Sequence, residues 1–381
     1  MTVMDVGVGK TVCALTIIKE RMDKFEVTGA LVVAPLRVCQ AVWEREALKW
    51  DYLQDMTFSL CWGAPEKRIA ALDIYADVYL VNYENLTWLL QHCKEKRKNS
   101  RWNLPFNMVV FDEVTRMANP SGVKCMEWNR TRVSYDWIKY TLGMTATPAT
   151  NGLMKLFGCY KALDKGKHLG TSVEAFRHEF FYRNEYTKAY SAYGGAKDRI
   201  FDRVKSMTYA VENKKIKVPS TERLYSVPLG IRAREQYEEL EQDMFTQLDA
   251  LTELEVLSAA ALSNKLLQFC NGTVYLGDVF EKPRRFKEVH DAKLEQLDVL
   301  VDEMQGNPVL VSYSFKLDRV RIKDRYPELN VKDVHDYKDA KDLIEDFKNV
   351  DILTGHPASM AHGIDGLQDH CHHLIVFGGN W

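Results

Sequence analysis

Three short stretches, in fixed order, decide the fold of this chain: Gly7-Val8-Gly9-Lys10-Thr11, Phe111-Asp112-Glu113-Val114 and Met144-Thr145-Ala146-Thr147-Pro148. In the first, glycines allow backbone N–H groups to close on phosphate, the lysine reaches the β- and γ-phosphates, and the threonine hydroxyl holds Mg²⁺. A full phosphate-loop pattern has glycine five positions before Gly9, but Met4 stands there, so only the second half of the pattern is present. The cofactors that these residues predict are ATP and Mg²⁺.

The second stretch supplies the acidic groups that such a site needs. An apolar run over residues 108–111 predicts a buried parallel strand that carries Asp112 at its end. We expect Asp112 to hold the Mg²⁺ of Thr11 through water, and Glu113 to orient the attacking water as the catalytic base. Lys10, Asp112 and Glu113 are therefore the predicted catalytic residues. An acidic pair that only solvates the end of a strand is the simpler alternative for this stretch taken alone.

Length and composition are those of a large soluble protein with several domains. The 381 residues are 46% hydrophobic and 27% charged, with a net charge of −2, so contacts to nucleic acid would depend on local basic clusters. Three such clusters are visible, at residues 94–101, 214–217 and 282–287. The eight cysteines are scattered without a CxxC pair, which favours reduced thiols and a cytoplasmic setting, and no apolar run is long enough for a membrane span.

Strands and helices are predicted to alternate in two regions of the chain. Buried strands are expected at residues 30–34, 77–81, 109–111 and 140–144, with a helix from Lys10 and another that places Trp43, Ala47 and Trp50 on one stripe. Long charged helices are expected at 232–257 and 259–270, and alternation resumes near residue 290. The pattern predicts two α/β domains with parallel sheets, at 1–165 and 286–381, and a helical insertion at 166–285. Ligands of such sheets bind at the carboxyl ends of the strands.

Together these motifs resemble those of superfamily-two helicases of the Swi/Snf-like branch, particularly the compact phage-encoded members. The resemblance extends along nearly the whole chain and implies two RecA-like domains, the second one incomplete. It assigns the phosphate loop to motif I, residues 32–38 to motif Ia, residues 111–114 to motif II, and residues 145–148 to motif III. Motifs Ia and III imply contacts to nucleic acid by Pro35, Leu36 and Arg37 and by Thr145, Ala146, Thr147 and Pro148.

Later segments separate this branch from the DEAD-box RNA helicases. Residues 266–272 are similar to the end of the Swi/Snf helical region, and residues 292–294 and 308–315 to the opening of the second motor domain. Residues 356–368 look like motif V, which implies contacts to the nucleic-acid backbone by His356 and Gly363. The family's usual string there is closer to Gly-Leu-Asn-Leu-Gln, so Ile364-Asp365-Gly366 is a departure.

Two family features are expected to be missing. The phosphate loop starts so near residue 1 that the strand leading into it and the upstream glutamine motif have no room, and no motif VI with its arginines follows residue 381. The resemblance implies an ATP-dependent translocase on nucleic acid, with duplex DNA favoured, acting in the host cytoplasm if the chain is phage-encoded. A nucleic-acid-binding fragment or scaffold without turnover is the main alternative, and an unrelated phosphate-loop enzyme such as a nucleotide kinase is a third.

Overall fold

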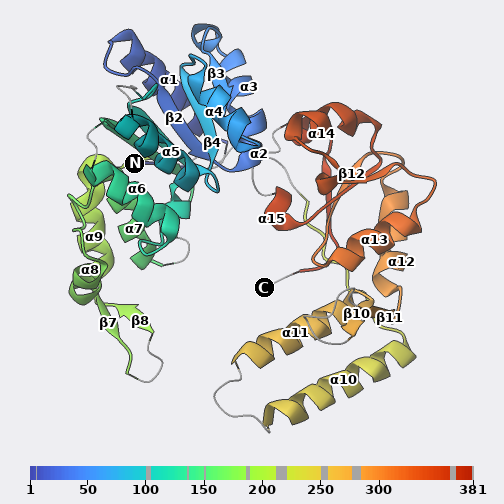
Figure 1. The fold of residues 1–381 in the computed structure, drawn as a ribbon. Helices are drawn as coiled ribbons and strands as arrows, with labels where there is room; N and C mark the ends of the chain where they lie inside the picture. Colours follow the sequence, from blue (N-terminus) through green and yellow to red (C-terminus); the bar gives the residue numbers. More distant parts are fainter. Residues whose placement is uncertain are drawn as a thin grey trace. The chain divides into compact units, whose positions relative to one another are not determined.

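A computed structural model describes residues 1–5, 7–99, 104–134, 137–149, 152–185, 189–211, 221–249, 256–276, 285–360 and 366–379. The chain divides into two compact units, Met1–Val218 and Pro219–Trp381 (Figure 1). Each unit is organised around a parallel sheet covered by helices, which confirms the predicted α/β fold class. No helix among the described residues is both long and apolar enough to cross a bilayer.

The sheet of the first unit is wholly parallel and has the order β3-β4-β2-β5-β6-β1-β9. Its strands are β1 (Thr2–Met4), β2 (Ala30–Ala34), β3 (Phe58–Leu60), β4 (Val78–Asn82), β5 (Met108–Asp112), β6 (Tyr140–Thr145) and β9 (Tyr209–Val211). The helices of this unit are α1 (Lys10–Asp23), α2 (Leu36–Ala41), α3 (Trp43–Leu48), α4 (Pro65–Asp73), α5 (Leu86–Asn99), α6 (Val123–Ser134), α7 (Met154–Asp164), α8 (Val173–Phe180) and α9 (Ala196–Val204). An antiparallel hairpin of β7 (Phe181–Arg183) and β8 (Tyr190–Ala192) extends beyond α8 (Figure 1).

Alternate residues of the central strands enter two separate cores, one on each face of this sheet. On one face Val32 and Val110 pack with residues of α1, α2 and α3. On the other, Val33 and Phe111 pack with residues of α5, α6 and α7. Both faces are covered, so the central strands are apolar throughout, which is the pattern from which they were predicted.

The first unit corrects two of the sequence predictions. The strand expected to be missing before the phosphate loop is present in short form, because β1 pairs with β6 on one side and β9 on the other. Trp50 does not continue the buried stripe of Trp43 and Ala47: α3 ends before it, and Trp50 takes an extended conformation with φ −127° and ψ 116°. Its indole N–H instead donates to Glu46 Oε1 at 3.1 Å on the protein surface.

The second unit combines a helical pair with a smaller parallel sheet. Helices α10 (Ile231–Asp249) and α11 (Val256–Cys270) pack against each other and are followed by the antiparallel pair β10 (Thr273–Leu276) and β11 (Arg285–Glu288) (Figure 1). The sheet has the order β13-β14-β12-β15, with β12 (Val309–Ser312), β13 (Val331–Asp333), β14 (Ile352–Gly355) and β15 (His373–Val376). Its helices are α12 (Ala292–Glu303), α13 (Lys316–Arg325), α14 (Ala340–Asp346) and α15 (Pro357–Met360).

A buried polar cluster joins the end of α11 to this second sheet. Asn271 donates from Nδ2 to Asp318 Oδ2 at 2.9 Å and accepts from Lys293 Nζ at 2.7 Å. The Arg321 guanidinium donates to the carbonyl oxygens of Asn271, at 2.7 Å, and His290, at 2.8 Å. Because Asn271, Asp318 and Arg321 are all buried, these bonds fix the end of α11 to the sheet of the second unit and its helices.

The stretch predicted as a helical insertion, residues 166–285, is divided between the two units. Its first part includes α8, α9 and β9, and β9 returns to the first sheet beside β1. Its second part includes α10 and α11 in the second unit. The domain boundaries at residues 165 and 285 stay predictions.

Candidate nucleotide-binding site

The phosphate loop, the acidic pair and the threonine stretch meet at the carboxyl edge of the first sheet. Strand β6 lies between β1 and β5, and Met144 is in register with Thr2 on one side and Asp112 on the other. The residues that follow the three strands therefore emerge next to one another. This register comes from tertiary pairing, because β1 (Thr2–Met4) lies far from β5 (Met108–Asp112) and β6 (Tyr140–Thr145) in the sequence.

The loop between β1 and α1 has the backbone of an anion cradle. Gly7 and Gly9 have φ values of 81° and 83°, a left-handed conformation that glycine adopts without penalty. No atom lies within 4 Å of the point where a side chain on Gly7 would begin, so the loop is open on that side. Helix α1 begins at Lys10, which directs its N-terminal N–H groups and positive dipole end toward the loop.

Lys10 is held by the loop that it follows. Its Nζ donates to the carbonyl oxygens of Met4, at 3.1 Å, and Asp5, at 3.3 Å. These are neutral acceptors, so the ammonium keeps its full charge for an anionic ligand. Thr11, the second residue of α1, is half-buried and lies in the same first turn of the helix as Lys10.

The Asp112 carboxyl ends β5 in an environment that disfavours its charge. Burial raises the pKa of Asp112 to about 6, and the neighbouring Glu113 carboxylate adds to this effect. The Lys10 ammonium and the indole of Trp43 act in the opposite direction and lower the pKa. A cation bound at this carboxylate would relieve the unfavourable burial of charge, so the residues present fit a site for Mg²⁺.

Glu113 is oriented by two threonine hydroxyls. Its Oε1 accepts from Thr145 Oγ1 at 2.7 Å and from Thr115 Oγ1 at 3.0 Å, and the N–H of Thr147 donates to Thr145 Oγ1 at 3.2 Å. Within the described part of the chain, no hydrogen bond reaches the second carboxylate oxygen, Oε2. The arrangement links the acidic pair directly to the Thr145–Pro148 stretch.

Sequence reasoning missed one member of this site. Tyr83, immediately after β4, is fully buried and its hydroxyl donates to the carbonyl oxygens of Asp112, at 2.9 Å, and Glu113, at 3.1 Å. The signal was present, since a tyrosine at the carboxyl end of a buried strand needs a partner for its hydroxyl. The identity of that partner depends on the order of strands in the sheet.

The residues predicted to contact nucleic acid lie in both units. Pro35, Leu36 and Arg37 follow β2 at the same carboxyl edge as the phosphate loop, and Ala146, Thr147 and Pro148 follow β6. His356 follows β14 in the second unit, while Gly363 lies outside the described residues. Of the basic clusters, residues 214–217 also lie outside them, and in the first cluster Lys94 and Lys96 form ion pairs with Glu127 and Asp73.

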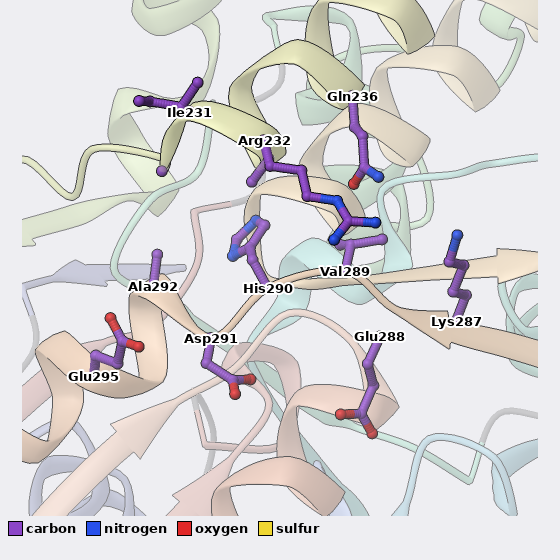
Figure 2. A pocket seen from close by; sticks show the side chains of 12 residues that line it. Ile231, Arg232, Gln236, Lys287, Glu288, Val289, His290, Asp291, Ala292 and Glu295 are labelled. Atoms are coloured by element: carbon purple, nitrogen blue, oxygen red, sulfur yellow. The ribbon is translucent and has the colours of Figure 1, made fainter.

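A cavity of about 560 Å³ in the second unit contains none of the predicted site residues. It lies between the start of α10 and the connection from β11 to α12, and Figure 2 shows Arg232 and Gln236 on one side and Asp291 and Glu295 on another. Its walls carry cations, carboxylates and the His290 ring, whose pKa burial lowers. Among the described residues, no cluster of three or more histidine, cysteine or acidic side chains is arranged to hold a metal ion.

Comparison with known proteins connects this geometry to one family. Residues 3–270 match the SNF2-related domain. A curated relative, putative protein p41 of Acyrthosiphon pisum secondary endosymbiont phage 1, is 31% identical in an alignment of 393 positions that covers 98% of this chain and 80% of that protein.

Three solved structures with a similar chain course are distant from this chain in sequence. The SWI2/SNF2 ATPase core of Sulfolobus solfataricus in complex with dsDNA is 17% identical, with a TM-score of 0.44, over 98% of this chain and 83% of that chain. The Hef helicase domain of Pyrococcus furiosus is 13% identical, with a TM-score of 0.49, over 98% and 91% of the two chains. The helicase Lhr of Mycobacterium smegmatis, bound to ssDNA and AMP-PNP, is 15% identical, with a TM-score of 0.48, over 98% and 39%.

Proposed function

Because the chain belongs to the SNF2-related domain family of helicase-like ATPases, we propose that it hydrolyses ATP with Mg²⁺ to move along nucleic acid, with duplex DNA as its substrate. The register that places Thr2, Met144 and Asp112 side by side carries this proposal. It brings a phosphate-binding loop and an acidic pair to one edge of a sheet, which is the arrangement that phosphoryl transfer requires.

We propose a role for each residue of this edge. The N–H groups of the Gly7–Gly9 loop and the Lys10 ammonium bind the phosphates, and Thr11 and Asp112 hold Mg²⁺, the latter through water. A magnesium ion there neutralises charge on the phosphates. Glu113, oriented through Oε1 by the two threonine hydroxyls, keeps Oε2 to position the attacking water and accept its proton.

The bond from Thr145 to Glu113 supports a coupling between hydrolysis and nucleic-acid contact. Pro35 and Thr145, which were predicted as contacts, are buried, so the proposed contacts are the residues that follow them: Leu36, Arg37, Ala146, Thr147 and Pro148. Thr145 links this stretch to the proposed catalytic base through its 2.7 Å hydrogen bond to Glu113. A change at Glu113 during turnover would therefore move this stretch. We propose His356 and Gly363 as contacts from the second unit.

Steady-state ATP hydrolysis with and without duplex DNA tests the proposal. We expect DNA-stimulated turnover in the unaltered chain, its loss in Glu113→Gln, and no change in Glu174→Gln, which alters an exposed carboxylate on α8. Retained binding of ATP and DNA without turnover would favour the alternative of a nucleic-acid-binding protein that does not hydrolyse ATP. Failure to bind either ligand would refute both.

A further inference from the structure

Tyr83 directly follows β4, at the carboxyl edge of the first sheet, where the nucleotide site is predicted. Its ring is fully buried against Phe111, with ring centroids 6.4 Å apart and planes 26° from parallel, and the Arg116 guanidinium lies 5.6 Å from its centroid. The hydroxyl is aimed at two successive carbonyl oxygens of the acidic pair, Asp112 and Glu113. None of the motifs from which the site was predicted includes this tyrosine.

The backbone at Glu113 needs such support. Glu113 has φ 62° and ψ 59°, in the left-handed region that side chains other than glycine, asparagine and aspartate seldom adopt. Strained conformations of this kind persist only where the surrounding structure holds them, and they concentrate at functional sites. Here the strain turns the Glu113 side chain toward Thr145 and Thr115, whose hydroxyls bind its Oε1.

The Tyr83 hydroxyl is suited to hold this turn. A phenol hydroxyl is an O–H donor, and this one lies 2.9 Å from the Asp112 carbonyl oxygen and 3.1 Å from that of Glu113. The Glu113 carbonyl also accepts from the N–H of Arg116 at 3.0 Å, which starts the short 3₁₀ turn after the acidic pair. Two donors on one carbonyl, one of them from the residue that follows β4, two strands away from β5, fix the direction of the peptide plane.

We propose that Tyr83 is a positioning residue for the acidic pair: its hydroxyl holds the left-handed turn at Glu113 and thereby sets the direction of the catalytic carboxylate. The effect on catalysis rests on the proposed function, whereas the hold on the turn at Glu113 does not. Tyr83 acts through the two carbonyl groups to which its hydroxyl donates.

The test compares two substitutions that each remove the hydroxyl of a buried tyrosine, Tyr79 in β4 and Tyr83 directly after it. Tyr83→Phe removes the donor to the acidic pair. Tyr79→Phe removes a hydroxyl that donates to the Ile74 carbonyl at 2.8 Å and accepts from the Ala76 N–H at 3.1 Å, at the opposite end of β4. We expect Tyr83→Phe to lower kcat by about 10- to 100-fold with little change in KM for ATP, because the misplaced base acts only in the transition state. Tyr79→Phe should leave kcat unchanged. An equal loss in both variants, or none in Tyr83→Phe, would overturn the proposal.

Amide hydrogen exchange separates this inference from the proposed function. Exchange at the Arg116 N–H, which is bonded to the Glu113 carbonyl, should become roughly tenfold faster in Tyr83→Phe and stay unchanged in Tyr79→Phe. If the unaltered chain showed no ATP turnover, the proposed function would fail while faster exchange would still support the positioning role. Unchanged exchange in Tyr83→Phe would refute that role whatever the turnover.

Discussion

Removing the ionisable carboxyl of Asp112 should make the protein more stable. This carboxyl is half-buried at the end of β5, and loss of solvation together with the Glu113 carboxylate disfavours its charged form. The substitution Asp112→Asn keeps the size and shape of the side chain but cannot ionise. Functional sites often contain groups that bind a ligand but lower the stability of the protein when no ligand is bound.

The expected gain follows from the pKa of Asp112. A shift from 3.8 to about 6 corresponds to roughly 3 kcal/mol, at ~1.4 kcal/mol for each pH unit. Since the folded state prefers the protonated form, this contribution to stability is fully present below pH 3.8 and is lost as the pH rises through about 6. The asparagine variant avoids the loss. It should therefore be more stable by about 3 kcal/mol near pH 8, and by only about 1 kcal/mol near pH 4.5.

Urea unfolding without nucleotide or metal measures this difference. The fluorescence of Trp43 and Trp128, both fully buried in the first unit, reports the relevant transition. Asp55→Asn is the control, because that carboxyl lies in an exposed turn. The reasoning would be refuted if Asp112→Asn were no more stable than the unaltered chain near pH 8, or if its advantage did not shrink toward pH 4.5.

Three further substitutions test separate parts of the structure. Lys10→Ala should abolish ATP binding in a calorimetric titration, because it removes the ammonium of the phosphate loop, and unchanged affinity would exclude Lys10 from the site. Gly158→Ala would place a methyl group 2.2 Å from the Ala118 carbonyl oxygen, so we expect a loss of at least ~1–3 kcal/mol in urea unfolding. Gly230→Ala, which has open space around it, should cost much less. Asn271→Ala leaves the buried Asp318 carboxyl and the half-buried Lys293 ammonium without their shared partner and should cost about 3 kcal/mol, whereas a loss under ~1 kcal/mol would show that the cluster does not hold the second unit together.

The central strands could be predicted because each is a short apolar run with both faces covered. The structure confirms β2 at the predicted residues and β4, β5 and β6 within one residue at either end. The short β1 and β9 have no comparable pattern, since three residues are too few to show a period. They form strands because they pair in the folded sheet, β1 with β6 and β9 with β1.

The failed prediction at Trp50 has a similar origin. The helical spacing of Trp43 and Ala47 in the sequence also includes Trp50. In the structure, however, α3 ends at Leu48, and the Trp50 indole N–H donates to Glu46 at the surface. Spacing alone does not show where a helix ends when the last turn has no strong stop signal.

The sequence by itself determined which chemical groups the proposed site has: a lysine and a threonine after glycines, an acidic pair after an apolar run, and a threonine stretch after another. These are local patterns, because residue type and spacing set which groups can bind phosphate or accept a proton. Tertiary structure decided how the groups work together. Pairing of β1, β6 and β5 brings Lys10, Asp112 and Thr145 to one edge, burial raises the pKa of Asp112, and Tyr83 supports the left-handed turn at Glu113 from β4, a strand that is separated from β5 by β2. Such effects depend on distance and solvent exclusion in three dimensions, and strand order is what sets both.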